Sequence, residues 1–240
     1  MTAEGAYPGT ELDLFAQAIR WKQYWRRHLT SVVRGTVLEV GAGLGSNTSL
    51  LLGPGVKRWV CLEPDVGLAA RLLRSVRSDP LTSAPGIVAG TLTALSPTAR
   101  FDVILYLDVL EHIADDHAEL ARAARHLRAG GALVVLAPAH PWLFSPFDAA
   151  VGHHRRYTLA SLADAVPASL VTQKLIYLDS VGLCASLGNR LLLSRAHPSF
   201  GQIAFWDRVL VPCSSQLDRL LGFRLGKSVL GVWRAPREIE

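Results

Sequence analysis

The segment 37–47, VLEVGAGLGSN, passes from a short apolar run with one acidic residue directly into three glycines. Glycine has no Cβ atom, so a turn containing Gly41, Gly43 and Gly45 lets a ligand lie against bare backbone. Ser46 and its neighbours supply N-cap chemistry for a helix whose first N–H groups face the same spot. The pattern predicts a strand, a nucleotide-type binding turn and a helix. The alternative is an ordinary strand-to-helix turn of an α/β sheet.

Two departures from the dinucleotide-binding pattern indicate which ligand the turn binds. Ser46 stands where the GxGxxG pattern starting at Gly41 requires glycine. Glu39 lies two residues before the first glycine, where a carboxylate suits a cationic group better than a pyrophosphate. The turn therefore favours a ligand without phosphates. At this point the sequence resembles the class I S-adenosylmethionine-dependent methyltransferases, whose first motif reads acidic-x-G-x-G-x-G and whose cofactor carries an ammonium and a sulfonium.

From residue 37 onward, apolar runs alternate with helical stretches, which is typical of βαβ units and a parallel sheet. The predicted fold class is α/β. The resemblance implies a Rossmann-like class I methyltransferase fold with a seven-stranded, mostly parallel sheet, flanking helices and a helical insertion before the last strand. Strands are predicted at 37–40, 58–62, 86–89, 103–107, 132–137, 170–177 and 228–234, and helices at 46–52, 66–77, 116–126 and 159–166.

A chain of 240 residues fits one α/β domain with some elaboration. We expect a single methyltransferase domain over residues 1–240. Its predicted parts are a helical cap at 1–34 with an amphipathic helix over 11–30, a cofactor-binding core at 35–178, a helical lid at 179–226 whose short helices are divided by Pro198 and Pro212, and a closing strand at 227–240.

Acidic and polar residues follow the predicted strands, at the edge where such sheets bind ligands. Glu63, after the second strand, is expected to accept hydrogen bonds from ribose hydroxyls; the alternative is a surface acid. The resemblance places Thr91 and Leu92 beside the adenine. It also places Leu107, Asp108 and His112, from the LDVLEH segment, beside the methionine part of the cofactor. A structural role for His112 is the alternative there. The resemblance further suggests that Tyr24, on the first helix, helps to close the pocket.

The segment 138–158 is too apolar to be left in solvent and too long for an ordinary connection, so it is predicted to form the acceptor side of the site. The apolar excess of the 179–226 segment predicts a lid over the same acceptor, with a dimer interface or a membrane-surface helix as rivals. The predicted acceptor-binding residues are Trp142, Phe144, Tyr157, Phe205 and Trp206.

Three histidines in the 138–158 segment are candidates for moving or orienting an acceptor proton: His140, His153 and His154. Adjacent residues of an extended chain point in opposite directions, so at most one of His153 and His154 is expected to face the pocket. A metal shared by His140 and one of this pair is an alternative. No metal is expected, because Asp148 is the single carboxylate of the segment.

The sequence accordingly predicts an S-adenosylmethionine-dependent enzyme of small-molecule biosynthesis, which methylates an O or N atom of a largely apolar or aromatic acceptor. An NAD-dependent oxidoreductase and a cofactor-binding protein without activity are the alternatives. The net charge of +5 is spread along the chain, so no nucleic-acid partner is expected. The absence of a signal peptide and of paired cysteine motifs predicts a cytoplasmic protein, either monomer or homodimer.

Overall fold

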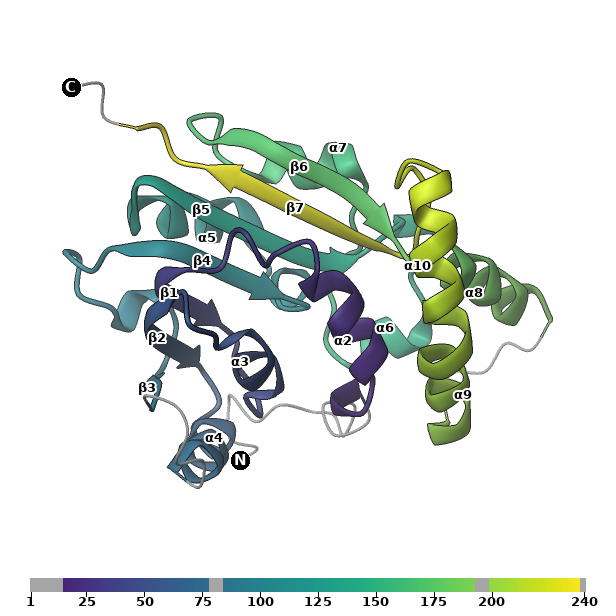
Figure 1. Ribbon diagram of the computed structural model, residues 1–240, viewed down its shortest axis with the longest axis horizontal. Coiled ribbons are helices and arrows are strands. Elements are labelled where there is room, and N and C mark those ends of the chain that lie inside the picture. The colour runs from purple at the N-terminus through teal and green to yellow at the C-terminus, as the bar shows by residue number, and fades with distance from the viewer. Residues whose placement is uncertain (1–14, 78–83, 193–198, 238–240) are drawn as a thin grey trace.

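The computed structural model describes residues 15–77, 84–192 and 199–237. Its centre is a seven-stranded sheet in the order β3-β2-β1-β4-β5-β7-β6 (Figure 1). The strands are β1 (Gly35–Val40), β2 (Val56–Glu63), β3 (Gly86–Ala89), β4 (Phe101–Leu107), β5 (Leu127–Pro138), β6 (Val171–Leu178) and β7 (Ser228–Arg234).

All pairings from β3 to β5 are parallel, whereas β7 is antiparallel to both β5 and β6. The strand order reverses at β1, which pairs with β2 on one side and with β4 on the other. Ligands of open α/β sheets bind at such a switch point, outside the carboxyl ends of the strands. The predicted fold class is confirmed, with every strand found and most of them longer than expected.

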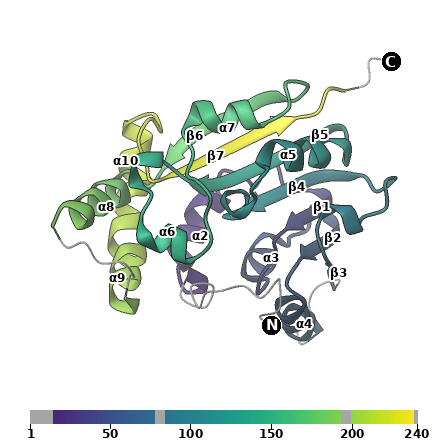
Figure 2. The same cartoon turned by 180° about the vertical axis from the view of Figure 1, so that it is seen from behind.

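Helices cover both faces of the sheet, which explains why its central strands are mostly apolar. They are α2 (Ile19–Arg26), α3 (Ser46–Leu51), α4 (Val66–Arg77), α5 (Asp116–Arg125), α6 (Pro146–Ala150), α7 (Leu159–Ala165), α8 (Ser180–Leu192), α9 (Phe200–Phe205) and α10 (Val211–Leu220), with short 3-10 turns η1 (Leu92–Ala94), η2 (Leu110–His112) and η3 (Pro141–Leu143). Figure 2 shows α5 and α7 on one face.

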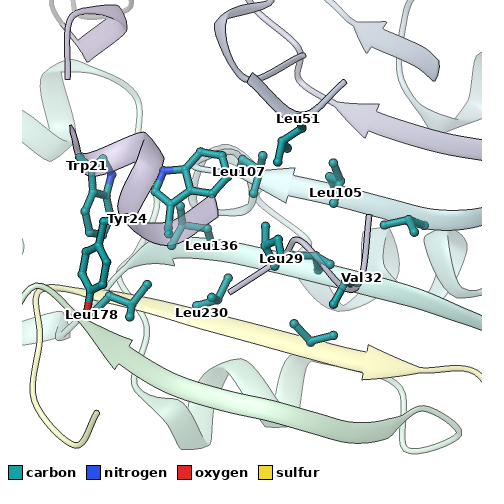
Figure 3. Packing of buried hydrophobic residues seen from close by; sticks show 14 of the residues in the cluster. Trp21, Tyr24, Leu29, Val32, Leu51, Leu105, Leu107, Leu136, Leu178 and Leu230 are labelled. Carbon is teal, nitrogen blue, oxygen red and sulfur yellow. The ribbon is translucent and has the colours of Figure 1, made fainter. Parts of the chain in front are cut away.

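Side chains alternate between two cores because successive residues of a strand point to opposite faces. Leu105 of β4 belongs to the core that also contains Trp21 and Trp25 of α2, and Figure 3 shows how such side chains meet between helix and sheet. Tyr106 belongs to the opposite core, with Leu120 of α5. Helix α2 is therefore fixed to the sheet by its aromatic residues.

The predicted lid region is helical, but its division differs from the expectation. Helix α9, the π-helical turn η4 (Trp206–Leu210) and α10 follow one another without a break, so Pro212 does not divide them. Proline has no N–H to donate, and a π-helical turn shifts the hydrogen-bond register next to it. The carbonyl of Arg208, four residues earlier, accepts from Arg20 Nη1 instead (2.9 Å). Pro198 lies outside the described residues.

Two further expectations need correction. The N-terminal helix was predicted to reach residue 30, but α2 ends at Arg26 and the chain continues in turns; its predicted start lies outside the described residues. The 138–158 segment was predicted to be a long connecting loop, but it contains η3 and α6, and Ser145 and Asp148 form a capping box at α6. No helix in the described ranges combines the length and the apolarity needed to cross a membrane.

Candidate active site

The turn after β1 has the backbone conformation that the glycines predict. Gly41, Gly43 and Gly45 have φ angles of +66°, +54° and +77°. These angles lie in the left-handed region, which L residues with a Cβ atom avoid. A Cβ atom on Gly41 would also lie 2.7 Å from Val109 Cγ2, and one on Gly45 would overlap Leu72 Cδ1. The turn therefore needs glycine for its dihedral angles and for close packing.

Glu39 is buried directly below this turn, with 1% of its surface exposed. Its Oε2 accepts hydrogen bonds from Thr48 Oγ1 and from Trp59 Nε1, the latter at 3.0 Å. Its Oε1 is buried and has no hydrogen-bond partner. Burial raises the pKa of Glu39 to about 7, and the hydrogen bonds act in the opposite direction. Buried carboxylate oxygens without a partner are rare in native proteins, so this atom is available to accept from a donor outside the chain.

Lys22, on α2, reaches across to the same place. Its Nζ donates to Ser46 Oγ (2.7 Å), the first residue of α3. Burial lowers the pKa of Lys22, while the carboxylates of Asp108 and Glu39 act to raise it. The Lys22 ammonium thus lies near two acids: Glu39, at the end of β1, and Asp108, in the turn after β4. An open hollow of about 280 Å³ adjoins it, lined in part by Ile19, Lys22 and Ser46.

Glu63 bends over the glycine turn at the end of β2. Its Oε2 accepts from Gly43 N (2.7 Å) and its Oε1 from Asp65 N (3.0 Å). Burial raises the pKa of Glu63, and these backbone donors act to lower it. The carboxylate that was predicted to hold ribose hydroxyls thus lies at the turn, bonded to backbone donors.

The residues predicted beside the adenine and the methionine are divided between surface and core. Thr91 is exposed and its Oγ1 lies 2.9 Å from Thr93 Oγ1. Leu92 and Leu107 are core residues, on opposite faces of the sheet. Asp108 reaches solvent, yet the protein surrounds it closely enough that burial raises its pKa to about 6.

Backbone strain gathers at the carboxyl ends of three strands. Asp108, His140 and Asp179 follow β4, β5 and β6, and their φ angles are +56°, +66° and +69°. Positive φ costs a non-glycine residue about 1–2 kcal/mol, and such residues concentrate at functional sites. The strain therefore marks the edge at which the glycine turn lies.

Three of the predicted site residues have their polar atoms hydrogen-bonded inside the protein. Tyr24 donates to Asp218 Oδ2 (2.6 Å), and Tyr157 donates to Asp116 Oδ2 (2.7 Å). Trp206 donates from Nε1 to Asp179 Oδ2 (2.7 Å), and Lys227 Nζ lies 4.2 Å from its ring centroid. All three side chains are buried. Amphipathic aromatic residues pack this way when a buried acceptor is available.

The three remaining aromatic residues predicted at the acceptor are partly or largely exposed: Trp142, Phe144 and Phe205. Trp142 lies beside His140, with ring centroids 5.2 Å apart. The cap over this edge also contains Phe15, which contacts both Phe147 of α6 and Trp206 of η4. Segments from the beginning, middle and end of the chain therefore meet there, as the positions of α2, α6 and α9 in Figure 1 show.

The three histidines have different surroundings. His140 Nε2 lies 2.9 Å from the carbonyl oxygen of Gly226, and its ring stacks on Tyr177. A carbonyl can only accept, so Nε2 carries the proton and Nδ1 has the lone pair. Burial lowers the pKa of His140. His154 is exposed, whereas His153 is half-buried and bonded through Nδ1 to Asp148 Oδ1 (2.9 Å).

Sequence reasoning missed three residues of the site. Lys22 was overlooked because the helix was read by its apolar face. Glu111 was overlooked although it precedes His112 directly. Asp148 was noted only as the single carboxylate of the 138–158 segment, whereas it is buried and binds Arg156 through two hydrogen bonds of 2.9 Å.

The fold and this edge of the sheet define a class I methyltransferase architecture, and the comparisons with known proteins agree. Residues 38–135, which contain the glycine turn, Glu63 and Asp108, match the family described as a methyltransferase domain. The predicted resemblance to the class I S-adenosylmethionine-dependent methyltransferases is confirmed for the fold and for this domain.

Individual relatives cover different parts of the chain. A demethylmenaquinone methyltransferase of Tropheryma whipplei is 32% identical over 168 residues, which are 67% of this chain and 65% of that protein. A tRNA U34 carboxymethyltransferase of Shewanella amazonensis is 28% identical over 120 residues, 48% of this chain. This chain spans only 36% of the length of that relative.

Among solved structures, the N-methyltransferase NodS of Bradyrhizobium japonicum, in complex with S-adenosyl-L-homocysteine, is similar with a TM-score of 0.58. It is 17% identical, and the match covers 92% of this chain and 88% of that one. At this identity the likeness shows the fold.

Proposed function

We propose that the protein is a methyltransferase that uses S-adenosylmethionine to methylate an O or N atom of a small, largely apolar or aromatic acceptor. The observation that carries the proposal is the unpartnered, buried Glu39 Oε1 beneath a glycine turn, within the segment that matches a methyltransferase domain. S-adenosylhomocysteine in the NodS structure and the name of the demethylmenaquinone methyltransferase support the cofactor and a small acceptor.

The residues at this edge fit such a cofactor. Glu39 Oε1 is an acceptor without a donor, and the acids Glu39 and Asp108 together suit an ammonium group. Lys22 is a counter-charge for a carboxylate. Gly43 has no Cβ atom, so its backbone is bare toward a ligand, and Glu63 is an acceptor for ribose hydroxyls once it leaves the Gly43 N–H. Glu39 and Asp108 thus suit the ammonium group, and Lys22 the carboxylate, of the amino-acid part of the cofactor.

The bound cofactor supplies an electrophilic methyl group on a sulfonium. The chain's own task is to align the acceptor and exclude water. Trp142 and Phe144 offer partly exposed rings near this edge, and α2 with η4 closes it with Trp21 and Trp206, whose ring centroids are 5.8 Å apart. His140, through its Nδ1, is the group that takes the proton of a hydroxyl or ammonium acceptor.

Three unpaired cysteines, one of them buried, support a reducing cytoplasmic location. We propose a monomer or homodimer with a role in small-molecule biosynthesis.

Calorimetric titration with S-adenosylmethionine and with NAD tests the cofactor. Binding of the first and not the second is expected, and the reverse would favour an oxidoreductase. Transfer of labelled methyl from S-adenosylmethionine to a panel of phenols, quinols and amines, with a tRNA pool as a separate arm, then tests the acceptor. Labelled small molecules are expected. Labelling of the tRNA alone would overturn the small-molecule assignment, and cofactor binding without transfer to any acceptor would favour a protein without activity.

A further inference from the structure

Beside the proposed cofactor site, three side chains with metal-binding atoms converge from two parts of the chain. Glu111 and His112 lie on η2, directly after β4, and His153 lies in the segment after α6. Their ligand atoms are all within 4.8 Å of one another. The rings of His112 and His153 are nearly perpendicular, with centroids 4.6 Å apart. The three ligand atoms are therefore close enough to share one ion at a common point between them.

Glu111 carries the independent sign that something binds there. It is 1% exposed, and its Oε2 is buried without a hydrogen-bond partner. Its Oε1 lies 3.9 Å from His153 Nε2, too far for a hydrogen bond. An ion pair with a protonated His153 would leave Oε2 unpartnered at a substantial desolvation cost. A dication at the common point satisfies the carboxylate.

His153 is held in the orientation that metal ligands usually have. Its Nδ1 donates to the buried Asp148 Oδ1 (2.9 Å), so Nε2 is the nitrogen that faces Glu111. Asp148 is fixed in turn by Arg156 and by Ser145 Oγ (2.6 Å). Metal-binding histidines almost always donate their other N–H to a carboxylate, a backbone carbonyl or a water, and Asp148 is such a carboxylate here. The backbone N–H of His154 also donates to the carbonyl of Glu111 (2.8 Å), which fastens the two segments together.

We propose that Glu111, His112 and His153 bind a first-row transition-metal dication of the Zn²⁺ type, with Asp148 as the positioning residue for His153. Two imidazoles and one carboxylate suit Zn²⁺ and its neighbours, whereas Mg²⁺ and Ca²⁺ prefer oxygen ligands. In a tetrahedral site with metal–ligand bonds of about 2.1 Å, neighbouring ligand atoms lie about 3.4 Å apart. The three ligand atoms lie within 4.8 Å of one another, so small side-chain rotations bring them to this spacing. Three protein ligands leave a position open for a water or an acceptor oxygen.

The position of the cluster suggests the use of that open position. Glu111 lies on η2, which closely follows Asp108 after β4, and Asp108 is part of the proposed cofactor edge. A metal there would hold an acceptor hydroxyl and favour the loss of its proton. This role rests on the proposed function, whereas metal binding itself does not.

Titration of the metal-free protein with Co²⁺, followed by visible absorption and by competition with Zn²⁺, tests the site. One equivalent is expected to bind, with the spectrum of a site containing nitrogen ligands. His153→Ala and Glu111→Gln should each weaken binding at least tenfold, and Asp148→Asn by roughly 10–100-fold, the usual effect of losing such a support. His117→Ala, at an exposed histidine outside the cluster, is the matched control and should change nothing.

Circular dichroism of each variant shows whether it is folded, and the nearly isosteric Glu111→Gln and Asp148→Asn keep the test valid if His153→Ala unfolds. The proposal is overturned if the folded wild type binds no Co²⁺ or Zn²⁺, if it binds Mg²⁺ equally well, or if His117→Ala alone removes binding. All these metal-binding measurements are made without S-adenosylmethionine, so their outcome is independent of the methyl-transfer assays. Loss of methyl transfer on chelation, with cofactor affinity unchanged, would support the acceptor role, and full transfer by chelated protein would overturn that role.

Discussion

Tyr24 of α2 donates a hydrogen bond to Asp218 of α10 across 194 positions of the sequence, at 2.6 Å. The same carboxylate accepts from the backbone N–H groups of Asp179 and Ser180, at 2.7 and 3.0 Å. A second acid, Asp207, accepts from the N–H of Trp21 (2.9 Å) in the first turn of α2. Two buried acids of the C-terminal helices therefore hold the N-terminal helix over the sheet edge.

Replacing Tyr24 with phenylalanine should lower the free energy of unfolding by about 1.5–3 kcal/mol, the range for hydrogen bonds to charged groups. Asp218 keeps its two backbone donors, so the fold should survive. Urea unfolding checks the value. A fall in S-adenosylmethionine affinity with unchanged stability would instead show that the hydroxyl belongs to the cofactor site.

Replacing Glu63 with alanine should weaken S-adenosylmethionine binding by about 1.5–3 kcal/mol, because ribose hydroxyls would lose a charged acceptor. Calorimetry measures the dissociation constant. Glu63→Gln, which keeps one acceptor oxygen, is the matched control and should lose less. Since Glu63 also accepts from Gly43 N, the unfolding curve of each variant must be compared with that of the wild type. An unchanged dissociation constant would make Glu63 a support for the turn alone.

The buried carboxyl of Glu39 should make stability fall as the pH rises. Its pKa is raised from 4.5 to about 7 in the folded protein, so the folded state binds more protons than the unfolded state between these values. Stability is therefore greatest below the lower pKa and is lost as the pH rises through the upper one, by about 3 kcal/mol in total. Glu39→Gln should remove this slope in urea unfolding measured from pH 4 to 8. An equally steep slope in the variant would assign it to another group.

Replacing His140 with alanine should lower turnover by roughly 10²–10⁴, the usual cost of losing a proton-transfer group, with cofactor affinity unchanged. His154→Ala is the comparison, because that side chain is exposed and should matter little. Equal, small effects of the two substitutions would mean that alignment alone drives the reaction.

Sequence patterns predicted the parts of the molecule that depend on local chemistry. The pattern of apolar residues located all seven strands, and the glycines at 41, 43 and 45 indicated a turn with bare backbone, which the structure shows with positive φ angles. Contacts between distant segments could not be predicted this way. Glu111 lies near His153 because the tertiary fold brings η2 beside the segment after α6, and Lys22 donates to Ser46 because α2 packs against α3. Neither contact follows from the spacing of these residues in the sequence.

The sequence also could not distinguish the neighbours Phe205 and Trp206, which were both predicted to bind the acceptor from the lid. Trp206 is 7% exposed, packs against Trp21 and donates to Asp179, whereas Phe205 is 57% exposed. Consecutive helical residues point about 100° apart, so one faces the core and the other does not.

Trp206→Ala should therefore cost about 3–5 kcal/mol of stability, the range for deleting a buried aromatic side chain, and should loosen the cap. Phe205→Ala should change stability by less than about 0.5 kcal/mol, as exposed positions do. Because Phe205 remains free to touch an acceptor or a surface, its substitution is the cleaner probe of the lid. A higher Michaelis constant for the acceptor, with cofactor affinity unchanged, is the expected result. Loss of binding to anionic vesicles, or conversion of a dimer to a monomer, without any change in acceptor kinetics would assign this face to a membrane surface or a subunit interface instead.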